Sequence, residues 1–180
     1  MIIFKEKILR NVDIKELIYF LTLAGLAVLI PAFFHVQWIT GSIVNAILVV
    51  TLFLLGVKKA ILIALVPSLV ALSVGLLPSI LAIAIPFLVV GNISYILFID
   101  YVYKNLQNKE KGFWFGLFFG AGFKFAFLFL SASFIIKLFT SETVALKIAQ
   151  IMTWMQFATA VAGGVIAWVI LKWLKKYKFF

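Results

Sequence analysis

Lys124 is the residue in this chain whose chemistry stands out most from its surroundings. It lies within an apolar run from Phe113 to Leu138, about twelve residues from the basic end of that run, or roughly 18 Å along a helix. A lysine cation at that depth in a membrane costs about 2.5 to 3.5 kcal/mol, so we expect it to face a bundle interior or a wet cavity. The chemistry that such a group offers is the binding of an anion.

Three further polar side chains lie at a matching depth in other apolar runs. Asn92, Gln156 and Thr159 each follow the outer start of their run by about eight to twelve residues. Amide and hydroxyl groups there can hydrogen-bond a ligand and orient it. A structural alternative stays open: Lys124 is neutral or reaches the outer interface, and the amides satisfy backbone groups that Pro86 frees.

A polar stretch, Pro31 to Asn45, interrupts the apolar sequence between the first two long runs and contains the only histidine. Polar groups in a membrane protein tend to lie where it works, so this stretch is a candidate ligand-contacting loop. The alternative is an ordinary interfacial turn with Trp38 as its anchor. The candidate substrate-binding residues are His35, Gln37, Trp38, Thr40, Asn45, Asn92, Tyr95, Lys124, Gln156 and Thr159.

The residues do not assemble into a catalytic group. His35 and Asp100 are expected on opposite sides of the membrane, about 30 Å apart, so no Ser-His-Asp group can form from them. Cysteine is absent, and one histidine without carboxylate neighbours makes no zinc site. The glycines of Gly116 to Lys124 lack the ending of a phosphate-binding loop and predict close helix packing. We therefore expect no enzyme activity, cofactor or metal.

Composition places these residues in a membrane protein. The 180-residue chain is 66% apolar and 12% charged, far from the balance of a soluble domain. Its net charge of +10 falls in links between apolar runs, which argues against nucleic acid as the partner and favours a lipid bilayer. We predict an all-α fold: one polytopic membrane domain over 1–180, a compact bundle of six transmembrane helices. The predicted elements are an interfacial segment at 1–15 and spans at about 17–34, 39–56, 60–77, 80–103, 113–138 and 148–171.

The distribution of basic residues predicts the orientation. Thirteen Lys and Arg fall in the two terminal segments and the second and fourth links, whereas the other three links hold only Lys137 and Lys147. By the positive-inside rule both termini are cytoplasmic and Pro31 to Asn45 faces outward.

Three segments carry a resemblance to a known family: PAFFHxQWITGxIVNA at Pro31 to Ala46, GLLPSxLAxxIPF at Gly75 to Phe87, and VGN at Val90 to Asn92. With the six-span layout, they resemble the substrate-binding S components of energy-coupling factor (ECF) transporters, nearest to the uncharacterised S-component-like membrane proteins. The resemblance implies an outward-facing pocket for a vitamin or related micronutrient. It also implies docking, through small residues of the first helix, onto a transmembrane coupling protein with ATPase subunits; here these residues are Ala24 and Ala27.

The sequence thus predicts a multi-pass protein of a prokaryotic cell membrane that binds a micronutrient for uptake. Because the chain has no nucleotide-binding motif, ATP coupling is expected from another chain. We further expect the ligand to carry a carboxylate or phosphate that reaches Lys124. The alternative is a structural or assembly membrane protein that acts through helix contacts without a small-molecule ligand.

Overall fold

Six long helices form the protein in the computed structural model, which describes residues 14–34, 36–73, 79–137, 145–146 and 152–177. The helices are α2 (Ile14–Phe33), α3 (Gln37–Leu55), α4 (Val57–Ser73), α5 (Ile85–Asn105), α6 (Lys109–Ile136) and α8 (Met155–Lys176). No strand occurs within those ranges. Five of the six helices are long and apolar enough to cross a membrane. The prediction of an all-α, compact helical membrane bundle is confirmed, and the chain is a multi-pass membrane protein.

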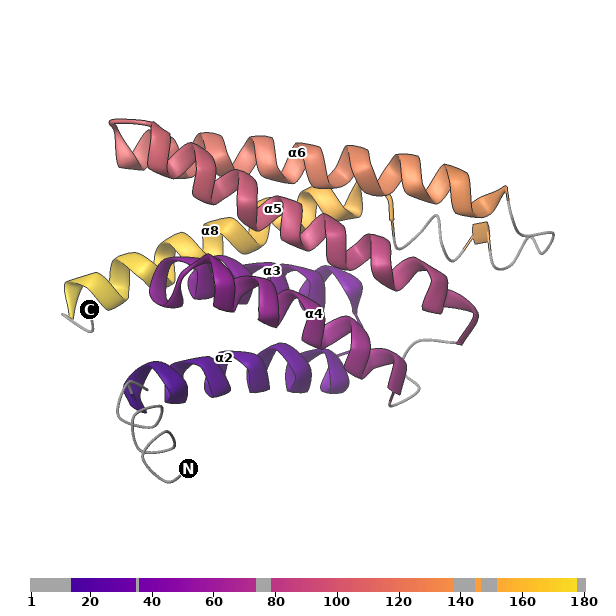
Figure 1. Cartoon of the computed structure of the whole chain (residues 1–180), viewed down its shortest axis with the longest axis horizontal. Coiled ribbons are helices and arrows are strands. Elements are labelled where there is room, and N and C mark those ends of the chain that lie inside the picture. The colour runs from indigo at the N-terminus through magenta and orange to yellow at the C-terminus, as the bar shows by residue number, and fades with distance from the viewer. Residues whose placement is uncertain (1–13, 35, 74–78, 138–144, 147–151, 178–180) are drawn as a thin grey trace, which may run out of the picture.

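The helices run side by side and alternate in direction along the chain (Figure 1). The helix pair α5 and α6 forms one side of the bundle, α2 forms the other, and α3, α4 and α8 lie between them. Glu16 at the start of α2 pairs with Lys59 at the start of α4, and Glu110 at the start of α6 pairs with Lys172 in α8. These pairs mark one end of the bundle, called here the basic end, where α2 begins and α8 ends.

Local sequence explains where several helices begin and end. Gly56 alone links α3 to α4, with a φ of 85° that side chains other than glycine rarely adopt, and its N–H caps α3 on the Leu52 carbonyl. The side chain of Asn108 caps α6 by accepting a hydrogen bond from the Lys111 N–H at 3.0 Å. Pro86 lies in the first turn of α5, where its missing N–H is harmless, and a 3-10 helix at Ser79–Ala84 precedes it.

Glycines let α5 and α6 approach closely. A Cβ added at Gly116 would lie 3.0 Å from the Ile99 Cα, and one added at Gly120 would lie 3.1 Å from the Tyr95 carbonyl oxygen. The predicted role of Gly116 and Gly120 in helix packing is therefore confirmed. Gly112 continues the same stripe against the backbone of Tyr103. This seam fixes the register of α5 on α6 and thereby places Tyr95 near the level of Lys124.

The orientation of the bundle remains a prediction that fusions can test. We expect reporters fused at residue 108, in the link between α5 and α6, and at the C-terminus to give a cytoplasmic signal, because the link and the C-terminal segment are both rich in lysine. The measurement is the activity of a reporter that works on only one side of the membrane. An extracytoplasmic signal from either fusion would overturn the predicted topology.

Candidate functional site

A buried polar centre lies where α3, α5, α6 and α8 meet. Lys124 of α6 is 2% exposed, and its ammonium group donates a hydrogen bond of 2.8 Å to the Oδ1 atom of Asn45 on α3. Asn45 is also 2% exposed, and its amide Nδ2 donates to the Gly41 carbonyl at 2.8 Å. Lys124 lies about fifteen residues, or roughly 22 Å, from the start of α6. The sequence prediction that Lys124 faces the bundle interior is confirmed.

Tyr95 of α5 completes this centre. Its side chain is fully buried, and the Lys124 ammonium lies 5.6 Å from the centroid of its ring. The hydroxyl group donates a hydrogen bond of 2.8 Å to the carbonyl oxygen of Ala160 on α8. The four groups, Lys124, Asn45, Tyr95 and the Ala160 carbonyl, are called here the Lys124 centre, and they join four helices through two hydrogen bonds and one cation–π contact.

Small residues bring α3 and α8 together beside this centre. A Cβ at Gly163 would lie only 2.6 Å from both the Asn45 Cβ and the Ser42 carbonyl oxygen, and one at Gly41 would lie 3.1 Å from the Thr159 methyl group. The backbones of the two helices therefore run nearly in contact, in parallel. Asn45 is held rigidly by this contact, because its Cβ is pressed against the glycine backbone. Gly163 supplies this contact, whereas the small-residue spacing that is evident in the sequence, Ala160-x-x-x-Gly164, brings Gly164 against Leu117 of α6.

The amide that binds Lys124 is the main difference from the sequence-based hypothesis. Asn92 and Gln156 were expected to orient a ligand at Lys124, with Asn45 in the outer stretch. Asn92 does lie near the depth of Lys124, because its neighbour Gly91 packs on Leu128, but it makes no hydrogen bond within the described residues. Asn45, not Asn92, is the observed partner, because the long Lys124 side chain reaches from α6 to Asn45 on α3.

The hydroxyl groups of the predicted residues Thr40 and Thr159, and that of Ser42 within the polar stretch, bond to their own helices. Thr40 donates to the Val36 carbonyl at 3.1 Å, Ser42 to Trp38 at 2.7 Å, and Thr159 to Met155 at 2.8 Å. Such bonds satisfy a hydroxyl proton inside an apolar helix without any ligand. The polar pattern that continues into α3 is thus partly structural, although each hydroxyl oxygen retains a lone pair that can accept a further bond.

Two tryptophans cover α3 and α8 at the end opposite the basic end. The rings of Trp38 and Trp154 meet edge to face, with their centroids 5.1 Å apart, and both are largely exposed. Trp154 was not among the predicted residues. His35 and the side chain of Gln37 lie outside the described part of the chain, so their predicted roles stay predictions.

No carboxylate among the described residues faces Lys124. The acidic residues of the described ranges pair with lysines elsewhere; the pairs are Glu16 with Lys59, Asp100 with Lys104, and Glu110 with Lys172. Lys124 is therefore held by a neutral amide and an aromatic face. An ammonium group has three donors, and the Asn45 bond uses one of them. Within the described ranges, the centre therefore has a lysine ammonium but no anionic group of its own.

The small residues of α2 predicted to dock a partner lie against the protein's own bundle. Ala27 is fully buried, and Ala24 is partly buried against the same core. The close approach that small residues allow is thus used between α2 and its neighbours in this structure. Docking through Ala24 and Ala27 stays a prediction, and it requires that α2 move to expose Ala27.

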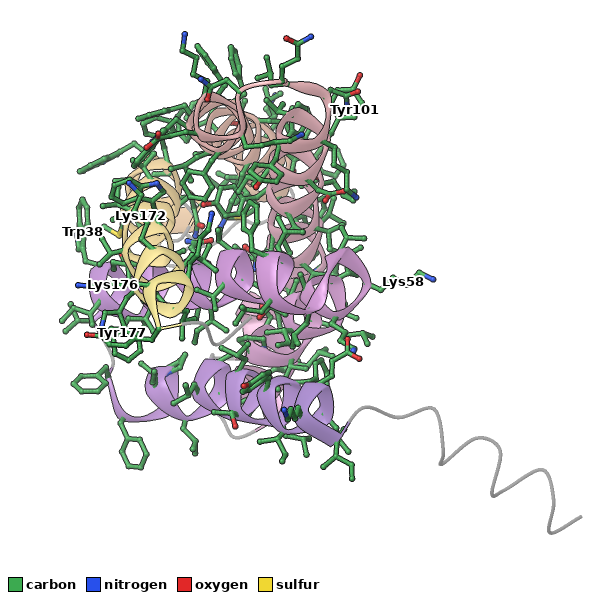
Figure 2. All side chains as sticks on the ribbon, turned by 90° about the vertical axis from the view of Figure 1, so that its left-hand side faces the viewer. Trp38, Lys58, Tyr101, Lys172, Lys176 and Tyr177 are labelled. Atoms are coloured by element: carbon green, nitrogen blue, oxygen red, sulfur yellow. The ribbon has the colours of Figure 1, made fainter. Side chains whose placement is uncertain are left out.

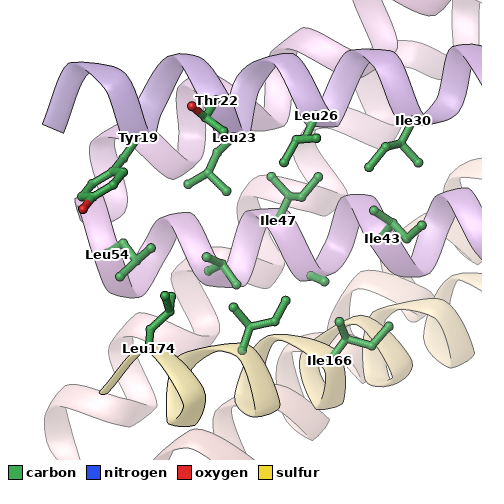
Figure 3. Close-up of a pocket in the computed structure, with 13 residues that line it drawn as sticks. Tyr19, Thr22, Leu23, Leu26, Ile30, Ile43, Ile47, Leu54, Ile166 and Leu174 are labelled. Atoms are coloured by element: carbon green, nitrogen blue, oxygen red, sulfur yellow. The ribbon is translucent and has the colours of Figure 1, made fainter. Parts of the chain in front are cut away.

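An apolar groove separates α2 from α3 and α8 (Figure 3). It has a volume of about 410 Å³, and its lining includes Leu23 and Leu26 of α2, Ile47 of α3 and Ile166 of α8. Tyr19 and Thr22 are the polar side chains in that lining. The groove has no charged side chain with which to select an ionic ligand, so the Lys124 centre remains the candidate site.

Metal binding is not indicated in the described part of the chain, where no group of three or more His, Asp or Glu side chains comes together. Comparisons of the chain with models of protein families, with curated proteins and with solved structures found no match.

Proposed function

We propose that this protein is a membrane-embedded binding subunit for a small anionic solute, and that Lys124 is the group that selects the negative charge. The observation that carries the proposal is the burial of Lys124 between four helices with a neutral amide as its hydrogen-bond acceptor. A cation held in this way is costly unless an anion joins it for part of the working cycle. A carboxylate or phosphate supplies that charge.

The geometry of the Lys124 centre supports binding of an anion once the helices part to admit it, because Lys124 and Asn45 are each only 2% exposed. Asn45 fixes the ammonium in place and leaves two of its N–H donors for the ligand. Tyr95 is held by Ala160, so its ring stays against the ammonium and limits the directions from which an anion can approach. In a site that excludes water, each charge-assisted bond to the ligand is stronger than at the surface. Gln156 and Thr159 of α8, and Asn92 of α5, are the residues that we propose contact the rest of the ligand.

The wider role that we propose is uptake of a vitamin or related micronutrient, with energy from a separate coupling protein and ATPase subunits in a prokaryotic cell membrane. Its support is the family resemblance of the outer segments together with the six-helix bundle. The rival is an assembly protein that uses Lys124 and Asn45 only to fix helix register, because a buried polar pair can specify how helices align. That rival requires no small molecule.

Mass spectrometry of the purified protein separates the two functions. We expect gently purified wild-type protein to release, on denaturation, a stoichiometric small molecule that carries a carboxylate or phosphate. The control is the Lys124→Met variant from the same cells, which keeps the aliphatic stem and removes the charge; we expect the compound to be depleted in it. Wild-type protein that carries no compound after growth in rich medium, yet folds normally, would favour the rival.

A further inference from the structure

A second charged cavity lies at the basic end of the bundle, between α3, α5, α6 and α8. Its volume is about 440 Å³. Its walls combine lysines from the start of α6 and the end of α8 with a floor of aromatic rings; the lysines are Lys109, Lys172 and Lys175, and the rings belong to Phe53, Tyr103, Phe113 and Trp168. Nothing in the candidate site above uses this cavity, called here the basic-end pocket.

The charge of the basic-end pocket favours an anion. Three lysines and the single carboxylate of Glu110 leave a formal charge of +2 in the lining. Lys172 lies 3.6 Å from the Glu110 carboxylate and 3.6 Å from the centroid of the Trp168 ring, so its ammonium is held over the pocket wall. The Lys175 ammonium makes no hydrogen bond or ion pair within the described residues. Two lysines of one helix turn therefore present donors to the same cavity.

Lys109 is held in place by backbone oxygens. Its ammonium donates hydrogen bonds to the carbonyls of Tyr103 at 3.1 Å and Lys104 at 3.2 Å, where α5 ends. The negative end of the α5 dipole thus keeps this cation at the pocket, and its third donor can meet a ligand. The pocket lies at the basic ends of four helices, α3, α5, α6 and α8, a position that fits the level of the lipid headgroups.

The aromatic floor points to the source of the anion. Phe53 packs edge to face on Tyr103 with their ring centroids 4.8 Å apart, and its centroid lies 5.6 Å from that of Phe113, so the floor of the pocket is apolar. A fully hydrated phosphate ion gains nothing from such a floor. A phospholipid offers both parts, a phosphate for the lysines and a glycerol and acyl region for the rings.

We propose that the basic-end pocket binds the phosphate headgroup of an anionic phospholipid from the adjacent leaflet. Lys172 and Lys175 bind the phosphate oxygens, Lys109 supplies a further charge, and Glu110 competes with the phosphate for Lys172. This proposal does not depend on the function of the Lys124 centre, because Lys109 and Lys124 are about 22 Å apart along α6.

Native mass spectrometry with two lipids of identical acyl chains tests the proposal. The full chain is purified and incubated with mixed micelles of detergent and either phosphatidylglycerol or phosphatidylcholine, and the retained lipid is counted. We expect phosphatidylglycerol to bind at least about tenfold more tightly, because its headgroup has a net negative charge that the lysines can bind. Equal retention of the two lipids by the wild type would overturn the proposal.

Three variants locate the binding. We expect the double variant Lys172→Gln and Lys175→Gln to lower the preference for phosphatidylglycerol about tenfold or more, and Glu110→Gln to raise it, because the competing carboxylate is gone. The matched control is Lys58→Gln, because Lys58 is a lysine of the same end that does not line the pocket. Figure 2, a view onto the basic end, shows Lys58 on the side of the bundle opposite Lys172. An equal loss from Lys58→Gln would mean non-specific attraction to a basic surface and overturn the pocket.

Added inorganic phosphate distinguishes the two sources of a phosphate group. We expect it to leave the bound phosphatidylglycerol in place at millimolar concentration, because it cannot use the aromatic floor. Displacement of the lipid by inorganic phosphate alone would overturn the lipid assignment. If the double lysine variant folds poorly, Glu110→Gln still tests the proposal, because this single change removes no lysine. An unchanged preference for phosphatidylglycerol in Glu110→Gln also contradicts the proposal.

Discussion

Replacing Asn45 by leucine is expected to destabilise the protein by about 3 kcal/mol or more. The change keeps the branched shape of the side chain and removes the oxygen that accepts the hydrogen bond from Lys124. The ammonium is then buried at 2% exposure without an acceptor among the described residues, and a buried charge without a partner is among the costliest defects in a folded protein. Thermal or denaturant unfolding in detergent, without added ligand, measures the loss.

A double-mutant cycle isolates the pair from other effects of the Asn45 change. We expect Lys124→Met alone to cost less than Asn45→Leu, because it removes the charge and leaves only the neutral Asn45 oxygen without its donor. We expect Asn45→Leu with Lys124→Met to recover most of the lost stability. The control is Asn92→Leu, an amide near the same depth that makes no hydrogen bond within the described residues. A double variant as unstable as Asn45→Leu alone would show that Asn45 acts through packing and not through Lys124.

Gly163→Ala is expected to lower stability by about 1 to 3 kcal/mol, the usual cost of overpacking. The added methyl group would lie 2.6 Å from the Ser42 carbonyl oxygen and 2.8 Å from the Ala46 nitrogen, and these backbone atoms cannot turn aside. The helices α3 and α8 must therefore separate, which also shifts Asn45 away from Lys124. The loss should appear in unfolding and in the yield of monodisperse protein.

Gly122→Ala is the matched control for the Gly163 prediction. An added Cβ at Gly122 meets no atom within 4 Å, and alanine is the better helix former, so we expect no loss of stability. Equal effects of the two substitutions would contradict the close contact between α3 and α8.

The fold class could be predicted from sequence because hydropathy and charge report directly on the membrane. Long apolar runs separated by lysine clusters predict spanning helices, and a helix satisfies its own backbone in lipid without help from neighbours. The insertion cost of a lysine likewise predicted that Lys124 faces the interior. These inferences depend on one residue or one segment at a time.

The partner of Lys124 could not be predicted in the same way because it depends on how several helices pack together. Asn45 and Lys124 are 79 residues apart, and their contact depends on the Gly163 seam, which sets how closely α3 packs on α8. A pattern within one helix has no information on that register. The role of the hydroxyl groups of α3 could not be predicted for a different reason. A serine in an apolar helix is typical of a binding site, but the Ser42 hydroxyl donates its hydrogen bond to the backbone of its own helix.

The claim that Lys124 selects an anionic ligand is tested most directly by titration. The compound recovered from the wild-type protein is added back to ligand-free wild type and to Lys124→Met, and its affinity is measured by calorimetry. We expect binding to be weaker by about 1.5 to 3 kcal/mol in the variant, the usual contribution of a hydrogen bond to a charged group, with the yield of folded protein unchanged. Equal affinity of the two proteins for that compound would contradict it.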